Sequence, residues 1–204
     1  MRPAGVPARL LWVVDREAIK NGSVPRALRA GVRWLHLRDA SITARIWQRH
    51  LQAWDPGRRV FGAVVNGGPR WAREAGWGAH LKAAQASLPR AQREAWTLLG
   101  RSVHDTGETR GALLDRPDYL VAGPVFATAS KPGHPGIGLD GLARIAAAAE
   151  GCPVLAIGGI AARHVAKIEA AGAYGVAIRS GITAARDPAS AALEYLTALP
   201  IDSG

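Results

Sequence analysis

Short apolar runs alternate along the chain with longer segments in which apolar residues recur at helical spacing. The first run, 11–15, and the last, 175–178, are typical: each is too short for a helix and rich in Val, Ile or Leu, as buried strands are. The runs follow one another at intervals of about 20 to 25 residues, with one helical segment after each. Eight strands are therefore predicted, at 11–15, 34–38, 60–66, 78–81, 98–104, 118–122, 154–157 and 175–178.

Residues that favour helix termini mark several of the intervening helices. Ser41 is a predicted N-cap, and either Asp105 or Thr106 is suited to cap the helix after the fifth strand. Gly76 is suited to end a short helix that begins at Pro69. The helical segments are predicted at 24–30, from 41, at 69–76, 88–96, from 105 or 106, and at 139–149, 161–171 and 182–199.

A strand followed by a helix, eight times over, predicts parallel strands joined by right-handed crossovers. Eight such units close a (β/α)8 barrel, and 204 residues lie at the lower end of the size range of that fold. The predicted fold class is α/β, a compact TIM barrel that forms a single domain over residues 1–204. The alternative is a doubly wound open sheet. That fold calls for a glycine-rich turn after the first strand, where 15–17 reads Asp-Arg-Glu.

Composition and charge narrow the classes of function. The chain has 26 Lys and Arg against 16 Asp and Glu, but the basic residues are scattered and no zinc-finger, RNP or basic-zipper pattern accompanies them. We expect no nucleic acid as partner, because a net charge of +10 also steers small anionic substrates. No apolar run approaches the roughly 18 residues of a membrane span, so we expect no membrane. A lone Cys152 and a first run too short for a signal sequence favour the cytoplasm.

In a barrel, the residues that follow the strands meet at one mouth, where the chemistry of this fold takes place. Arg38 and Asn66 end the second and third strands, so we expect both to bind substrate, and His104 ends the fifth. His36 lies two residues before Arg38, and side chains two apart on a strand face the same way. His36 is therefore expected to face inward, one layer lower. Arg179 is expected to point outward or toward the rim, and we assign it no role.

Glycine-containing turns follow the last two strands, at Gly158 and Gly159 and at Ser180 and Gly181. Glycines let the backbone approach an anion closely, and free N–H groups at helix starts attract it. This is also where the fold commonly binds a phosphate. The alternative is that the glycines only turn tight corners, but the two turns together favour phosphate.

A loop rich in Gly and Pro, 123–138, follows the sixth strand. Thr128, Ser130 and Lys131 supply hydroxyl and ammonium donors suited to a carboxylate or a phosphate. The same composition also suits a flexible lid.

Five segments, in order along almost the whole chain, resemble one known family. The most specific are the loop GPVFATASKPGH within 123–138 and the turn AIGGI within 154–160. With 75–81, 101–104 and 174–188 they resemble the family of thiamine phosphate synthase and TenI, a thiazole tautomerase. The resemblance implies a (β/α)8 barrel whose small-molecule substrate is a thiazole phosphate, and a homodimer. It places Gly158, Gly159, Ser180 and Gly181 at the phosphate, and Thr128, Ser130 and Lys131 beside the thiazole and a neighbouring anion.

This chain departs from the family pattern at the positions that would hold a metal ion. Synthases of this family join a thiazole phosphate to a pyrimidine methyl diphosphate and release diphosphate, which Mg²⁺ holds through oxygen ligands. Their pattern has Asp after the asparagine that ends strand three, where this chain has Gly67, and another about five residues beyond His80, where 82–85 reads Lys-Ala-Ala-Gln. Their second-strand stretch ends in Lys, where this chain has Ala40, and the position of Asp39 argues against it as a substitute ligand. We therefore expect no metal and no cofactor, with Mg²⁺ only if the synthase function holds.

The residues expected at the thiazole phosphate are present, and those expected at the diphosphate are missing. This combination is typical of the TenI branch of the family. TenI isomerises a thiazole phosphate carboxylate to its aromatic form by proton transfer, which needs no metal. The TenI pattern places its catalytic histidine where this chain has Pro124, so His104 and His36 are the candidate replacements. Tautomerase-like sequences have His at the position of His36, where synthases favour Gln. The alternative for each is a hydrogen-bonded structural histidine.

The leading interpretation is a TenI-like thiazole tautomerase of thiamine biosynthesis. One alternative is a thiamine phosphate synthase with a rearranged metal site. Another is a non-catalytic binder or regulator that keeps only the pocket for thiazole phosphate.

Overall fold

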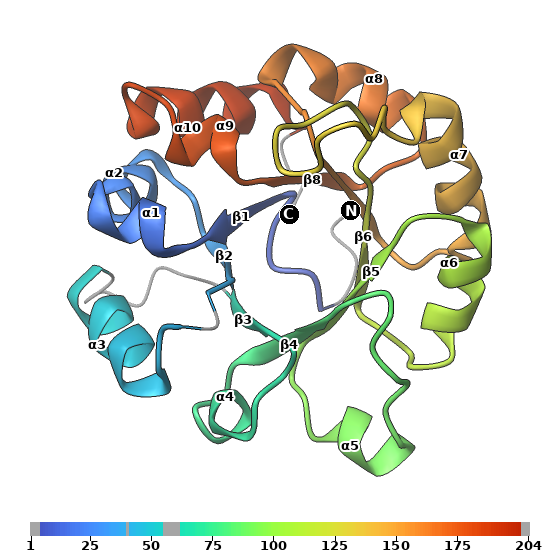
Figure 1. The fold of residues 1–204 in the computed structure, drawn as a ribbon, viewed down its shortest axis with the longest axis horizontal. Helices are drawn as coiled ribbons and strands as arrows, with labels where there is room; N and C mark the ends of the chain where they lie inside the picture. The colour runs from blue at the N-terminus through green and yellow to red at the C-terminus, as the bar shows by residue number, and fades with distance from the viewer. Residues whose placement is uncertain (1–4, 40, 55–61, 201–204) are drawn as a thin grey trace.

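The computed structural model describes residues 5–39, 41–54 and 62–200. Eight parallel strands form a closed barrel in the order of the sequence, with the helices around it (Figure 1). The last strand pairs with the first, with Leu10 opposite Val176 and Trp12 opposite Ile178, which closes the barrel. The predicted (β/α)8 fold is confirmed. Within the described ranges, no helix has the length and apolar character needed to cross a membrane.

The strands are short and lie close to the predicted runs. Each has four or five residues, enough to cross the barrel wall once. Of the predicted third strand, positions 60 and 61 lie outside the described residues. The strands are β1 Leu10–Val14, β2 Trp34–Leu37, β3 Gly62–Asn66, β4 Gly78–Leu81, β5 Leu99–Val103, β6 Tyr119–Ala122, β7 Val154–Ile157 and β8 Gly175–Ile178.

Helices cover the outside of the barrel and are shorter than predicted in several places. The predicted helix 88–96, for example, is reduced to five residues, and a further short helix follows β1. The helices are α1 Arg16–Lys20, α2 Ser23–Ala30, α3 Ala44–Trp54, α4 Arg70–Glu74, α5 Arg90–Glu94, α6 Thr106–Leu113, α7 Gly138–Ala148, the 3-10 turn η1 Ala162–His164, α8 Val165–Ala170, α9 Ser180–Thr183 and α10 Pro188–Ala198.

The N-caps seen in the structure confirm one predicted helix start and show that others are wrong. Asp105 is the N-cap of α6, as one of two predicted candidates: its carboxylate accepts from the backbone N–H of Glu108. Ser41 is not an N-cap, because its backbone N–H donates to Asp39 and α3 begins only at Ala44. The single helix predicted over 182–199 is wrong. Asp187 and Pro188 start a new helix there, since a cap followed by proline is a helix N-terminus.

Side chains along each strand alternate between the barrel interior and the helix layer. Leu11, Trp34 and Tyr119 belong to a cluster drawn from the strands and their flanking loops, without a helix residue, so it fills the interior. The rings of Trp34 and Tyr119 meet edge to face at 4.7 Å. Trp12 and Val14 instead join the larger cluster that the helices share. The lower interior is therefore a packed core, and space for a ligand is left at the carboxyl ends of the strands.

Candidate active site

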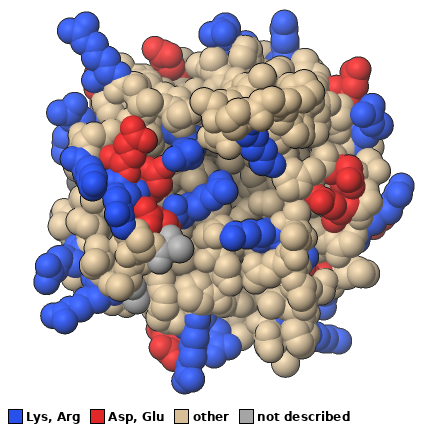
Figure 2. All heavy atoms as spheres, in the orientation of Figure 1, with Lys and Arg blue, Asp and Glu red and all other residues tan. Residues whose placement is uncertain are grey.

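A cavity of about 520 Å³ opens at the carboxyl ends of the strands. Figure 2 shows this face as a central hollow with Lys and Arg side chains gathered around it. All of the residues predicted for the site line this cavity, although they come from six of the eight strand ends and loops. They are His36, Arg38, Asn66, His104, Thr128, Ser130, Lys131, Gly158, Gly159, Ser180 and Gly181. Their convergence is observed, and their individual roles stay predictions.

The cavity is built in two layers because side chains two residues apart on a strand point the same way. His36 lies below Arg38 on β2, and His80 lies below Lys82 at the end of β4. All four line the cavity, so on β2 and on β4 an imidazole lies in the lower layer and a cation in the upper layer. The prediction that His36 faces inward below Arg38 agrees with this arrangement.

The lower layer contains two neutral histidines in contact, with ring centroids 4.5 Å apart. His80 is fully hydrogen-bonded: Nδ1 lies 3.0 Å from the Tyr119 hydroxyl and Nε2 lies 2.9 Å from Ser102 Oγ. Burial, followed by the charge of Arg38, lowers the pKa of His80 to about 3. This histidine is structural, as the bonds to both ring nitrogens show.

His36 differs from His80 because its Nε2 is buried without a hydrogen-bond partner among the described residues. Burial lowers the pKa of His36 well below its usual value, and the neighbouring His80 and Arg38 add to the shift. A hydrogen bond with Asn66 opposes the shift. His36 is thus a neutral imidazole on the cavity wall with one nitrogen unused.

His104 stands in the upper layer between a carboxylate and an ammonium group. Its Nδ1 lies 2.8 Å from Glu108 Oε2, and its Nε2 lies 3.1 Å from Lys131 Nζ. Glu108 also accepts from the backbone N–H of His104 at 2.7 Å. The geometry places the imidazole proton on Nδ1, so that Nε2 accepts from the ammonium group. Glu108 was not predicted; its position four residues after a strand-end histidine, in a helix first turn, is the only signal for it.

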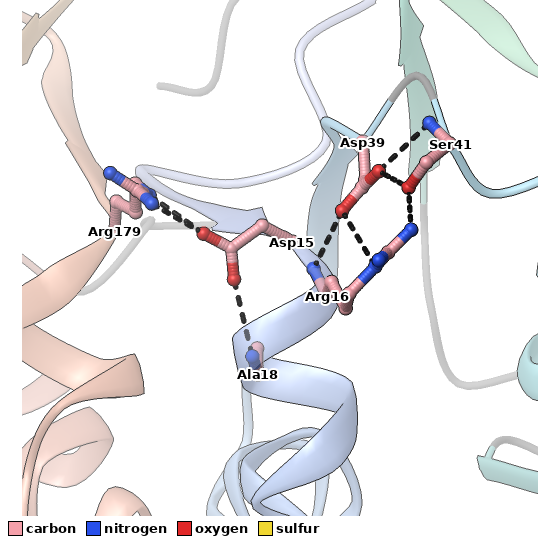
Figure 3. A network of polar contacts seen from close by, with 6 residues as sticks. All are labelled: Asp15, Arg16, Ala18, Asp39, Ser41 and Arg179. Carbon is pink, nitrogen blue, oxygen red and sulfur yellow. Dashed lines mark hydrogen bonds and ion pairs between the residues drawn. The ribbon is translucent and has the colours of Figure 1, made fainter.

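Asp15 and Arg179 join the first and last strands at the mouth (Figure 3). Asp15 caps α1 by accepting from the Ala18 N–H, and its other oxygen accepts from Nε and Nη2 of Arg179, each at 2.8 Å. Arg179 also donates to Ser130 Oγ at 3.1 Å and lines the cavity. Of the two expected orientations of Arg179, outward or toward the rim, the structure shows the second, because Asp15 holds its partly exposed guanidinium at the mouth of the cavity.

The glycine turns line the cavity, and close contacts with neighbouring segments explain why glycine is found there. Gly158 and Gly159 have φ of 99° and 66°, and a Cβ on Gly159 would lie 2.5 Å from the carbonyl oxygen of Ala127. A Cβ on Gly181 would lie 2.2 Å from the Tyr195 hydroxyl. The tight-corner interpretation therefore holds at both turns. It does not compete with phosphate binding, because the turns pack on neighbouring segments and still line the cavity.

The acidic residues near the mouth do not form a site for Mg²⁺. Asp15 is the only acidic residue lining the cavity in the described part of the chain, and Arg179 holds it. Asp39 accepts from the Ser41 N–H at 2.9 Å and from the Arg16 N–H at 3.2 Å (Figure 3). The described residues contain no group of three or more His, Cys, Asp or Glu that could hold a metal ion. A hard cation needs several oxygen ligands, and these residues do not supply them.

A closed barrel of eight parallel strands, with helices outside and a cavity at the carboxyl mouth, defines the class of (β/α)8 barrel proteins. Within that class, the chain belongs to the thiamine monophosphate synthase family, whose TMP-TENI family model matches residues 10–182. This confirms the family predicted from the sequence segments.

Individual relatives carry the same family name. The chain is 41% identical to a thiamine-phosphate synthase of Mycolicibacterium smegmatis over 102 residues, 50% of this chain and 45% of that protein. It is 34% identical to one of Caldivirga maquilingensis over 122 residues, 59% of each protein. The chain thus matches only about half the length of these curated relatives. A thiamine phosphate pyrophosphorylase structure from Pyrococcus furiosus superposes with a TM-score of 0.76 at 26% identity, covering 93% of this chain and 94% of that one.

Proposed function

We propose that this protein binds a thiazole phosphate in the mouth of the barrel and acts on it as an enzyme of thiamine biosynthesis. The observation that carries the proposal is the convergence of all the predicted site residues on one cavity. Membership of the thiamine monophosphate synthase family supports the choice of ligand.

The donors that suit a phosphate and those that suit the ring lie side by side in the cavity. The glycine turns after β7 and β8 suit the phosphate, because Gly158, Gly159 and Gly181 line the cavity and have no side chain that would keep an anion from the backbone. Beside these turns, the loop after β6 contributes Ser130 and Lys131, whose hydroxyl and ammonium donors suit the ring substituents or a second anion. A thiazole phosphate would lie against the turns with its ring next to this loop.

The first candidate reaction is that of a thiamine-phosphate synthase, the name carried by the relatives. The thiazole nitrogen forms a bond to the methylene carbon of a pyrimidine methyl diphosphate. The carbon–oxygen bond to the diphosphate breaks, and its electron pair leaves with the diphosphate. Arg38, Lys82 and Lys131 line the cavity, where their positive charges would stabilise the leaving group.

The second candidate reaction is the tautomerase isomerisation, in which an imidazole takes a proton from a ligand carbon and returns it elsewhere. His36 lines the cavity and its Nε2 has no hydrogen-bond partner among the described residues, but that nitrogen is buried, so the ring would have to turn before it could exchange a proton with a ligand. His104 is the other candidate, with Glu108 orienting its ring and Lys131 at its Nε2. Neither reaction is routed through a metal ion, since the residues of the mouth do not fit one.

Two assays on the purified protein test the proposal. In the first, thiazole phosphate and pyrimidine methyl diphosphate are supplied with EDTA or with Mg²⁺, and thiamine phosphate is quantified. In the second, the non-aromatic thiazole phosphate carboxylate is supplied and its aromatisation is followed by ultraviolet absorbance. Product in the first assay supports the synthase, and product in the second supports the tautomerase. Binding of thiazole phosphate without either product would overturn the enzymatic part of the proposal and support the non-catalytic binder, and no binding would overturn the whole proposal.

A further inference from the structure

Two of the four cationic side chains that line the cavity have no hydrogen-bond or ion-pair partner among the described residues, although the Asp15 carboxylate acts on one of them, Arg38, from a distance. Arg179 is held by Asp15, and Lys131 contacts an imidazole nitrogen. Arg38 and Lys82 make neither a hydrogen bond nor an ion pair through their side chains with any residue that the structure describes. Unpaired like charges in one cavity repel one another, so an anionic ligand is the group that would relieve them.

Lys82 enters the cavity from the loop in which the synthase pattern has an acidic residue. The pattern places carboxylates at the positions of Gly67 and about Gln85, and the structure brings these two together: Gln85 Nε2 lies 3.4 Å from the Gly67 carbonyl oxygen. The two loop positions are therefore neighbours, as a shared metal ion would require, although neither residue lines the cavity. Here they carry no negative charge, and the loop of Gln85 presents the Lys82 ammonium group to the cavity.

The loop that carries Lys82 is fixed from behind by a buried ion pair. The Arg101 guanidinium donates to the carbonyl oxygens of Ala83 and Gln85 and pairs with Asp115. Asp115 in turn accepts from the backbone N–H of Leu88 at 2.9 Å. Arg101 and Asp115 are 6% and 2% exposed, so this support is part of the packed structure. Lys82 is thus presented from a defined backbone position.

We infer that Lys82 and Arg38 form a subsite for a diphosphate group that needs no divalent cation, with ammonium and guanidinium supplying the positive charge. The described cavity lining has four cationic side chains and one carboxylate, an excess of three positive charges. A diphosphate monoester carries about three negative charges near neutral pH, so the charges match. The inference rests on the proposed function only for the choice of diphosphate as the anion.

Calorimetric titration with inorganic pyrophosphate tests this subsite directly. We expect pyrophosphate to bind in EDTA and Lys82→Met to weaken binding about tenfold or more, the size expected for a charge-assisted hydrogen bond. Lys82→Arg should retain most of the affinity. Lys167→Met is the matched control, because Lys167 is exposed on α8 and does not line the cavity, so its loss should change affinity less than twofold.

Two results would overturn the inference: pyrophosphate binding that appears only with Mg²⁺, or Lys82→Met binding within twofold of the unchanged protein. Thermal unfolding of each variant shows that the fold is kept. A parallel titration with thiazole phosphate reports on the proposed function by itself. If thiazole phosphate fails to bind while pyrophosphate binds through Lys82, the proposed function fails and the subsite stands.

Discussion

Arg179 donates through Nε and Nη2 to a single carboxylate oxygen of Asp15, each nitrogen lying 2.8 Å away. The pair bridges the seam where β8 meets β1, and Arg179 extends the link to Ser130 in the loop after β6. One carboxylate therefore neutralises one of the cations of the mouth and, through Arg179, links the loop after β6 to the first and last strands.

Asp15→Asn should separate these two effects. Asparagine keeps an oxygen that can cap α1, but it releases Arg179 and adds one positive charge to the cavity lining. We expect pyrophosphate to bind several-fold more tightly in calorimetry and the free energy of unfolding to fall by about 1 kcal/mol or less, because Arg179 is partly exposed. Asp140→Asn, an exposed change on α7, is the control for overall charge. Weaker pyrophosphate binding in Asp15→Asn would contradict this account of the mouth.

Glu108 should act as a positioning residue for His104. Its removal in Glu108→Ala leaves His104 Nδ1 without its acceptor and frees the ring to turn away from Lys131. If His104 moves a proton in either candidate reaction, kcat should fall about tenfold or more with little change in KM. Glu108→Gln keeps an oxygen acceptor and should recover part of the loss. Equal activity of Ala and Gln variants, or a change in KM alone, would exclude the positioning role.

The buried histidines should make stability depend on pH. Both have lowered pKa values in the folded protein, so above about pH 6.5 folded and unfolded states are neutral and their contribution is complete. As the pH falls, the histidines of the unfolded chain bind protons, whereas the two buried histidines of the folded protein stay neutral. The free energy of unfolding should fall by about 1.4 kcal/mol per pH unit for each imidazole, and for His80 this continues toward its folded pKa of about 3.

Urea unfolding between pH 7 and pH 5 measures this slope, in a range above most carboxylate titrations. His36→Gln should reduce the slope by about one proton while leaving His80 to titrate. A slope that is the same in both proteins would show that His36 already accepts a proton in the folded state.

Breaking the buried ion pair of Arg101 and Asp115 should lower the free energy of unfolding strongly. Asp115→Ala leaves the Arg101 guanidinium charged and buried without its partner, which costs about 3–5 kcal/mol in proteins of this kind. Glu74→Ala removes a comparable pair on the surface, with Arg70 on α4, and should cost less than about 0.5 kcal/mol. Denaturant unfolding compares the two variants. Similar losses in both would show that the Arg101 pair is hydrated rather than buried.

The fold and most of the site lining follow from local sequence patterns. Period-2 alternation within strands and the residue at each strand end predict which side chains reach the mouth, because all eight strands are parallel and end at one rim. His36 and Arg38 are two residues apart on one predicted strand, and this spacing predicts that both side chains face the cavity. The glycine turns at Gly158 and Gly181 are found because backbone geometry limits which residues fit there.

The parts that could not be predicted depend on partners distant in sequence. Arg179 is held at the mouth of the cavity by Asp15, which lies 164 residues earlier in the chain. The position of Lys82 depends on Arg101, which holds the loop from the neighbouring strand. The contact between Gly67 and Gln85 likewise joins two loops, and neither residue type signals it. Such pairings arise where neighbouring strands bring their loops together in the folded barrel, and no local pattern signals them.

That contact leads to a gain-of-function prediction. In Gly67→Asp with Gln85→Asp, two carboxylates would be placed where the synthase pattern has them. Aspartate tolerates the left-handed backbone better than most residues, and a Cβ at position 67 meets nothing within 4 Å. We expect Mg²⁺ to strengthen pyrophosphate binding by the double variant at least tenfold, and to have little effect on the unchanged protein.

The single variants are the controls, because one added carboxylate provides too few oxygen ligands and by charge alone should weaken pyrophosphate binding in EDTA. Adding Lys82→Gly to the double variant should make binding depend on Mg²⁺ almost entirely, since the ammonium group no longer competes with the cation for the same oxygens. If Mg²⁺ has no effect on either multiple variant, the two loop positions do not form a shared site, and the ammonium group of Lys82 does not stand in the place of a metal ion.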